Sequence, residues 1–167
     1  MANHLNLPNW VTLSRLLVIP VMFGALSSGA VWGRQVAVVA FLVGAATDWL
    51  DGFLARSLNQ ESDLGKLLDP LVDKLLTIAP LLILVELGEL PAWGVFFLIA
   101  RELVITAWRQ GQPQIQGANL WGKLKTVSQI IAIATLLLQL PHAIWLFWLA
   151  LTLTWISGMI YVLPNQL

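Results

Sequence analysis

Apolar segments of membrane-spanning length alternate along the chain with short stretches of glycine, proline and polar residues. A helix needs about 20 mostly apolar residues to cross the ~30 Å hydrocarbon core of a bilayer. The pattern therefore predicts six transmembrane helices, separated at the glycine, proline and polar breaks. We expect them over residues 9–26, 35–58, 63–87, 91–110, 120–140 and 143–163. Residues 7–10, Leu-Pro-Asn-Trp, predict a short interfacial entry into the first helix.

The composition agrees with lipid as the solvent of these segments. Of the 167 residues, 58% are hydrophobic and 11% are charged, whereas soluble domains carry roughly 25% charged residues. Six helices leave no room for a separate soluble domain, so we expect a single membrane domain over residues 1–167. Arg15 and the apolar run after it could be read as a secretory signal. The preceding residues are uncharged and further apolar segments follow, so we interpret this run as a retained first helix.

The positions of the basic residues predict an orientation. Nine Lys and Arg residues balance nine Asp and Glu residues, so the net charge does not suggest nucleic-acid binding. If six helices alternate in direction, Arg34 falls toward one side and the other basic residues fall toward the opposite side: Arg15, Arg56, Lys66, Lys74, Arg101, Arg109, Lys123 and Lys125. The positive-inside rule makes that opposite side cytoplasmic. We therefore expect both termini in the cytoplasm and Glu86 and Glu89 in an external turn.

Tryptophans close to the predicted helix ends are interpreted as interfacial anchors rather than as ligand-stacking residues. They are Trp10, Trp32, Trp93, Trp121 and Trp145.

Four aspartates flank two consecutive predicted helices. Asp48 and Asp51 lie about 60° apart around the first helix, and Asp69 and Asp73 share a stripe of about 80° with Gly65 on the next. Two adjacent antiparallel helices can therefore direct four carboxylates toward one point. Unpaired acids are costly at membrane depth, so this cluster requires shared protons, basic partners or divalent cations.

The available ligand types narrow the choice of metal. The chain has no cysteine and only two histidines, so a protein-bound metal needs carboxylate oxygens, which indicates Mg²⁺ or Mn²⁺. Two such cations balance four carboxylates and can bind a diphosphate, stabilising charge on the attacking and leaving oxygens. Gly52 and Ala55 leave room for a large polar group near the backbone, and Arg56 can bind a phosphate oxygen. The alternative, solvated helix ends around a loop, suits Glu61 and Asp63 better than the four aspartates.

The segment from Asp48 to Asp73 matches the pattern D-x2-D-G-x2-A-R-x8-G-x3-D-x3-D at every fixed position. In this segment the chain resembles the CDP-alcohol phosphatidyltransferase family. Residues 8–20, Pro-Asn-x2-Thr-x2-Arg-x4-Pro, are similar to the family's N-terminal segment. The resemblance implies an all-α integral membrane protein, a bundle of six transmembrane helices, a homodimer, and a cytoplasm-facing site for two divalent cations, Mg²⁺ or Mn²⁺.

The resemblance also implies roles for individual residues. The implied metal ligands are Asp48, Asp51, Asp69 and Asp73, with Asp73 acting as the general base as well. The residues implied to shape the CDP-lipid site are Gly52, Ala55, Arg56 and Gly65, with Asn9 and Thr12 at its edge.

Residues 100–109 and 122–129 are most similar to family members that use sn-glycerol 3-phosphate as the acceptor. The implied reaction moves the phosphatidyl group of CDP-diacylglycerol to the acceptor's 1-hydroxyl, giving phosphatidylglycerol phosphate and CMP at a bacterial cytoplasmic membrane. Candidate ligands of the acceptor's phosphate are Arg101, Arg109, Lys123 and Lys125. Two alternatives stay open: the lysines can contact anionic lipids, and Arg101 with Glu102 can form a structural pair.

Three other functions stay open as well. The same fold can use inositol phosphate, serine or a phospholipid as the acceptor. Intramembrane prenyl transferases also hold magnesium diphosphate with aspartate-rich helices, but they lack the Asp-Gly-x2-Ala-Arg arrangement. A divalent-cation transporter with midplane carboxylates would move ions without CDP-lipid, although no internal repeat indicates the inverted halves of a transporter.

Overall fold

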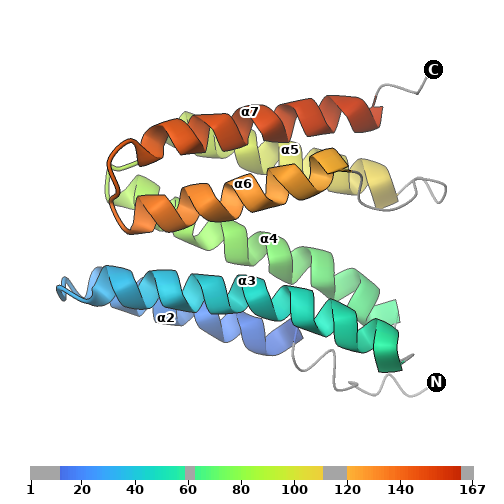
Figure 1. Ribbon diagram of the computed structural model, residues 1–167, viewed down its shortest axis with the longest axis horizontal. Coiled ribbons are helices and arrows are strands. Elements are labelled where there is room, and N and C mark those ends of the chain that lie inside the picture. The colour runs from blue at the N-terminus through green and yellow to red at the C-terminus, as the bar shows by residue number, and fades with distance from the viewer. Residues whose placement is uncertain (1–11, 59–62, 111–119, 163–167) are drawn as a thin grey trace. The chain divides into compact units, whose positions relative to one another are not determined.

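The computed structural model describes residues 12–58, 63–110 and 120–162, and side chains are described for these ranges except 48–67, 109–110 and 161–162. The described residues form six α-helices and a short 3₁₀ turn, without a β-strand (Figure 1). The elements are η1 (Arg15–Leu17), α2 (Val18–Ser27), α3 (Gly33–Leu58), α4 (Asp63–Glu86), α5 (Ala92–Gln110), α6 (Leu120–Leu137) and α7 (Ala143–Val162). Each of the six apolar segments of the sequence is thus confirmed as helical.

One predicted helix end is wrong. The sequence predicts α6 to residue 140, but the helix ends at Leu137 because Gln139 adopts a left-handed backbone conformation with φ of 53°. The amide of Leu140 then bonds to the carbonyl of Thr135 at 3.0 Å, which satisfies a carbonyl of the last turn. Glycine is the residue that usually marks such an ending, as Gly88 does after α4 with φ of 73°.

The first compact unit, residues 1–83, contains α2, α3 and most of α4. Helices α2 and α3 pack against each other as a hairpin (Figure 1). At Gly44 of α3, an added Cβ would lie 2.9 Å from the side chain of Leu76 on α4. The missing side chain at Gly44 therefore lets α4 approach α3 closely. Met22, Phe41 and Val72 are among the fully buried side chains of this unit.

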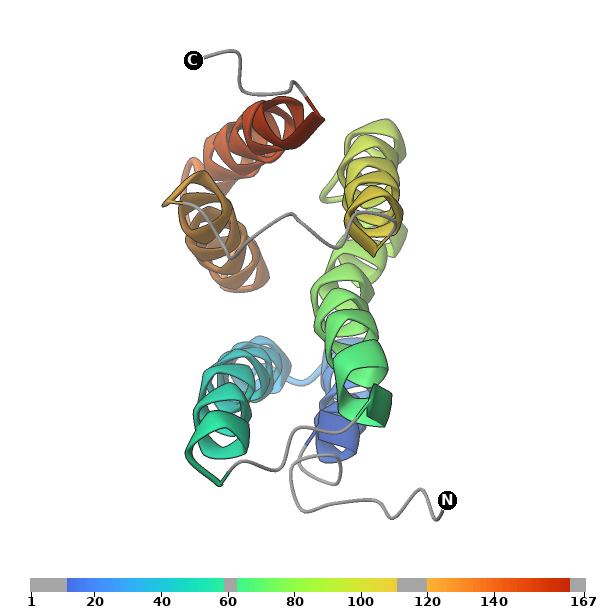
Figure 2. The same ribbon diagram turned by 90° about the vertical axis from the view of Figure 1, so that its right-hand side faces the viewer.

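The second unit, residues 84–167, contains α5, α6 and α7. Helix α7 packs against both other helices, and α6 and α7 lie next to each other in the end-on view of Figure 2. Gly94 of α5 admits the aromatic rings of α7, because an added Cβ would lie 3.0 Å from the Trp148 ring. Trp148 also stacks on Trp93, with ring centroids 4.8 Å apart. Glycine and aromatic residues thus set the close approach of α5 and α7.

Two of the described helices, α6 and α7, are long and apolar enough to cross a membrane. The segments Thr12–Ser27 and Gly33–Thr47 are apolar but shorter, and α5 carries charged residues in its second half. Helix α7 is apolar around its whole circumference and exposes Leu149, Trp155, Ile156, Met159 and Ile160. A helix of this kind either lies in a core or spans a membrane, and the exposure of these side chains favours contact with lipid.

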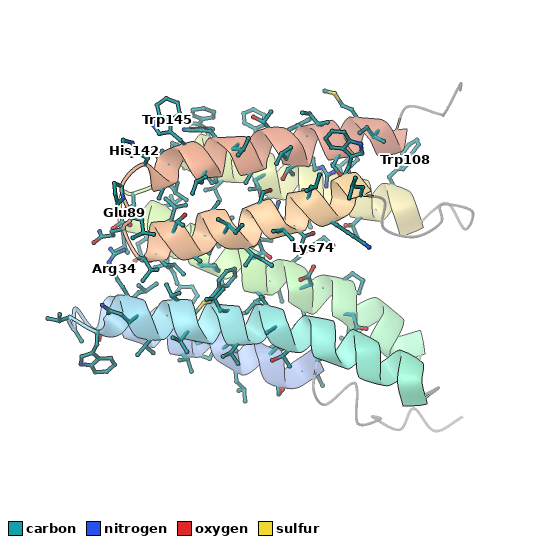
Figure 3. All side chains as sticks on the ribbon, viewed as in Figure 1. Arg34, Lys74, Glu89, Trp108, His142 and Trp145 are labelled. Carbon is teal, nitrogen blue, oxygen red and sulfur yellow. The ribbon has the colours of Figure 1, made fainter. Side chains whose placement is uncertain are left out.

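The tryptophans occupy the predicted helix ends in the described parts of the chain. Trp32 precedes α3, and exposed tryptophans also lie in the first turns of α5, α6 and α7: Trp93, Trp121 and Trp145. Trp10 lies outside the described residues. In the second unit, Trp145 and Trp108 lie at opposite ends (Figure 3).

Candidate functional site

The four aspartates lie on the two helices predicted for them. The backbone of Asp48 and Asp51 belongs to α3, and that of Asp69 and Asp73 belongs to α4. Four other predicted site residues lie on the same two helices: Gly52, Ala55, Arg56 and Gly65. For these four residues, and for Asp48 and Asp51, the structure describes the backbone only. Asn9 also lies outside the described residues. The α4 half of the predicted metal site can therefore be described.

Asp69 and Asp73 are one helical turn apart on α4, and both are exposed. Thr12, which is 2% exposed, donates a hydrogen bond of 2.8 Å from Oγ1 to Oδ1 of Asp69. The sequence predicts Thr12 at the edge of the CDP-lipid site, and the structure shows that its hydroxyl contacts a predicted metal ligand. A buried hydroxyl thereby orients an exposed carboxylate.

The carboxylate oxygens of Asp69 and Asp73 are suitable ligands for a hard divalent cation. Carboxylate oxygens are the ligands that Mg²⁺ and Mn²⁺ prefer, and metal-binding carboxylates are typically oriented by a hydrogen bond from a neighbouring residue. The described side chains contain no group of three or more His, Asp or Glu residues that could hold a metal. Asp69 and Asp73 can supply two ligands, and the other two predicted ligands, on α3, are outside the described side chains.

A second group of polar side chains lies inside the second unit and centres on Glu102 of α5. Oε1 of Glu102 accepts a hydrogen bond of 2.6 Å from Nζ of Lys125 and one of 3.1 Å from Nε2 of Gln129, both on α6. Nη1 of Arg101 lies 3.5 Å from the same oxygen. The side chains of Arg101, Glu102 and Lys125 are only 5%, 12% and 14% exposed. Arg101, Glu102, Lys125 and Gln129, together with Thr154 of α7, are named the Glu102 cluster below.

Helix α7 completes the Glu102 cluster. Nε2 of Gln129 lies 3.0 Å from Oγ1 of Thr154, and this fully buried hydroxyl donates to the carbonyl of Ala150 at 2.7 Å. One turn after Thr154, an added Cβ at Gly158 would lie 2.8 Å from Nε of Arg101. The bare backbone of α7 at Gly158 therefore provides the space that the Arg101 guanidinium occupies.

The structure describes the side chains of three of the four basic residues predicted for the acceptor's phosphate: Arg101, Lys123 and Lys125. Arg101 and Lys125 are brought together by Glu102, so the structural pair of Arg101 with Glu102 is observed and includes Lys125 as well. Lys123 is exposed, and it lies about 200° around α6 from Lys125. The side chain of Arg109 lies outside the described ones.

Sequence reasoning missed the residues that support the Glu102 cluster: Gln129, which contacts Glu102, Thr154, which contacts Gln129, and Gly158, which leaves space for Arg101. The sequence contains a weak indication of two of these residues. Gln129 and Thr154 are buried polar residues within mostly apolar helices, and a buried polar group needs a hydrogen-bond partner. The sequence does not indicate which partner each residue finds.

Comparison with known proteins gives matches along most of the chain. The family model described as CDP-alcohol phosphatidyltransferase matches residues 5–156. A Bacillus subtilis (strain 168) protein named CDP-diacylglycerol–glycerol-3-phosphate 3-phosphatidyltransferase is 38% identical, covering 96% of this chain and 95% of the relative. Proteins of the same name from Yersinia pestis (strain Pestoides F) and Sodalis glossinidius (strain morsitans) are 35% and 36% identical. These cover 83% and 80% of this chain, and 80% and 78% of the relatives.

Proposed function

The chain belongs to the CDP-alcohol phosphatidyltransferase family, and on this premise we propose that it transfers a phosphatidyl group from CDP-diacylglycerol to sn-glycerol 3-phosphate. The products are phosphatidylglycerol phosphate and CMP, so the protein is a transferase of phospholipid biosynthesis. The observation that carries the proposal is the complete aspartate signature from Asp48 to Asp73, in a chain whose relatives carry this enzyme name over most of its length.

We assign the binding of two divalent cations, Mg²⁺ or Mn²⁺, to Asp48, Asp51, Asp69 and Asp73. Bound cations would supply positive charge to hold the diphosphate of the donor. Thr12 orients Asp69, which is supported by their hydrogen bond. The small residues Gly52, Ala55 and Gly65, together with Arg56, are assigned to the CDP-lipid site, with Asn9 and Thr12 at its edge.

Asp73 is assigned as the general base. It takes the proton from the 1-hydroxyl of the acceptor while that oxygen bonds to the lipid-side phosphorus of the donor. The bond between this phosphorus and the bridging oxygen breaks at the same time, and CMP leaves with the bonding electrons. The assignment is supported by the exposure of Asp73 one turn from Asp69, on the same helix.

The acceptor's phosphate is assigned first to Arg101 and Lys125, because a phosphate dianion is best bound by two converging cationic donors. These two residues contact the same carboxylate oxygen. Lys123 and Arg109 stay further candidates. Lys123 is exposed, which agrees equally with contact to anionic lipid headgroups.

The membrane arrangement is also part of the proposal. We infer six transmembrane helices in a single membrane domain, a homodimer, and a bacterial cytoplasmic membrane, with the site and both termini facing the cytoplasm. Two apolar helices of spanning length and the exposed apolar residues of α7 support the membrane location. The uneven distribution of basic residues supports the orientation.

The test uses the purified chain with CDP-diacylglycerol and Mg²⁺, and it offers glycerol 3-phosphate, glycerol, serine and inositol phosphate in separate reactions. CMP release is measured and the lipid product is identified. We expect CMP and phosphatidylglycerol phosphate with glycerol 3-phosphate only. Turnover with another acceptor would contradict the acceptor assignment, and ion flux into vesicles without need of CDP-lipid would indicate a transporter.

A further inference from the structure

One carboxylate oxygen organises two cationic side chains inside the second unit. Lys125 and Arg101 each place a nitrogen within 3.5 Å of Oε1 of Glu102. Two like charges this close repel each other strongly where water is scarce, and both side chains are largely buried. The carboxylate of Glu102 is therefore what allows the ammonium and the guanidinium to occupy neighbouring positions.

Three helices hold this carboxylate in place. Glu102 belongs to α5, Gln129 reaches it from α6, and the same amide contacts the buried hydroxyl of Thr154 on α7. Thr154 is in turn bonded to the backbone of its own helix. Because every contact in this chain of hydrogen bonds lies within one compact unit, the position of Glu102 is set by the packing of that unit.

The contact with Glu102 also restricts Lys125. A lysine ammonium sits on a flexible four-carbon stem and gives up considerable rotamer freedom when it binds an anion. Holding the stem before the ligand arrives reduces that loss. An ammonium has three N–H donors, and the contact with Glu102 uses one of them, so donors of Lys125 are left for phosphate oxygens.

We propose that Glu102 is a positioning residue for the acceptor. It does not contact the substrate. Its carboxylate holds Lys125 and Arg101 at the spacing at which both bind one phosphate monoester, so that glycerol 3-phosphate is preferred over a neutral alcohol. This inference rests on the proposed function and deepens it, by naming the residue through which the acceptor's phosphate is recognised.

The main test is Glu102→Gln, which keeps the size of the side chain and a carbonyl acceptor but removes the charge. We expect the KM for glycerol 3-phosphate to rise by roughly ten- to a hundredfold, the effect of losing a well-placed charge-assisted contact. The KM for CDP-diacylglycerol and the kcat at saturating acceptor should stay near those of the parent. Glu102→Asp retains the charge on a shorter stem and should restore part of the affinity. A purely structural role would not separate the two KM values.

The matched control is Glu89→Gln. Oε1 of Glu89 accepts a 2.9 Å hydrogen bond from Nε2 of Gln139, so the control also removes a carboxylate from a contact with a glutamine. Figure 3 shows Glu89 at the end of the second unit away from Trp108. Both KM values of this variant should equal those of the parent.

A second variant keeps the inference testable if Glu102→Gln does not fold. Gln129→Met preserves much of the volume of the side chain but removes the amide that links Glu102 to Thr154. It should raise the KM for glycerol 3-phosphate by a smaller factor and leave the KM for CDP-diacylglycerol unchanged.

The outcomes separate this inference from the proposed function. A parent chain that makes no phosphatidylglycerol phosphate overturns both. If the parent is active and folded Glu102→Gln keeps the parent's acceptor KM, the positioning role is overturned while the function stands. A lowered acceptor KM also overturns it, because Glu102 would then compete with the phosphate for Lys125. If Glu102→Gln does not fold, an unchanged or a lowered acceptor KM in Gln129→Met overturns the positioning role, and a raised one supports it.

Discussion

The hydroxyl of Thr12 donates a 2.8 Å hydrogen bond to Oδ1 of Asp69, joining the N-terminal helical segment to α4 across 57 residues of sequence. Thr12 is almost completely buried, whereas Asp69 is exposed. A side chain held in the interior thus sets the orientation of a carboxylate that faces outward. Such outer partners commonly change metal affinity when they are removed.

Thr12→Val should weaken the binding of the divalent cation by roughly tenfold or more, because the carboxylate of Asp69 loses the donor that orients it. The measurement is direct Mn²⁺ binding in the absence of substrates, together with the dependence of CMP release on Mn²⁺ concentration. Thr152→Val is the control, since the hydroxyl of Thr152 bonds only to the carbonyl of Trp148 in its own helix. Equal Mn²⁺ affinity in both variants would remove Thr12 from the site.

Asp73→Asn should lower kcat by roughly 10²- to 10⁴-fold, the usual contribution of a positioned general base. An amide has nearly the same shape as the carboxylate but cannot take the acceptor's proton. CMP release at saturating substrates measures the effect. Glu86→Gln, an exposed change at the end of the same helix, should keep the parent's rate. An active Asp73→Asn variant would show that another group accepts the proton.

Lys125→Gln and Lys123→Gln form a matched pair on α6. Lys125 contacts Glu102 at 2.6 Å and is largely buried, whereas Lys123 is exposed. Loss of a charge-assisted contact is worth about 1.5 to 3 kcal/mol, so Lys125→Gln should raise the KM for glycerol 3-phosphate by roughly ten- to a hundredfold. Lys123→Gln should change it little. A larger increase of this KM in Lys123→Gln than in Lys125→Gln would indicate that the phosphate binds at Lys123, on the exposed face of α6.

Gly158→Ala tests the position of the Arg101 guanidinium. The added methyl group would lie 2.8 Å from Nε of Arg101, so the guanidinium has to shift. We expect a raised KM for glycerol 3-phosphate with little change for CDP-diacylglycerol, and a stability loss of about 1 to 3 kcal/mol from overpacking. Gly24→Ala is the control because an added Cβ there meets nothing within 4 Å. An unchanged acceptor KM in Gly158→Ala would argue against Arg101 as a phosphate ligand.

The orientation predicted from the basic residues can be checked with reporters. A reporter fused after Leu167 should lie in the cytoplasm, and one inserted between Gly88 and Pro91 should lie outside. The insertion site is suitable because Gly88 ends the turn that follows α4 and α5 begins at Ala92. Opposite locations of the two reporters would overturn the orientation and the cytoplasmic site together.

The helices themselves were largely predictable from local sequence. Apolar runs set where each helix forms, and breaks such as Gly88 and Pro91 set most of the ends. Gln139 was the exception, because a left-handed glutamine has no signature in sequence comparable to that of glycine. The aspartate spacing also assigned Asp69 and Asp73 to one face of one helix, since helical geometry alone relates residues four apart.

The sequence by itself thus determined the helical class, the order of the helices and the family signature, because these depend on residues close together in the chain. Only the tertiary structure decided that Lys125 meets Glu102 across 23 residues, while Lys123 stays exposed. It also decided that Gln129 reaches Thr154 and that Thr12 reaches Asp69. Such contacts depend on how far each helix is rotated about its axis and how closely its neighbours approach. These are set by the interlocking of side chains from distant segments.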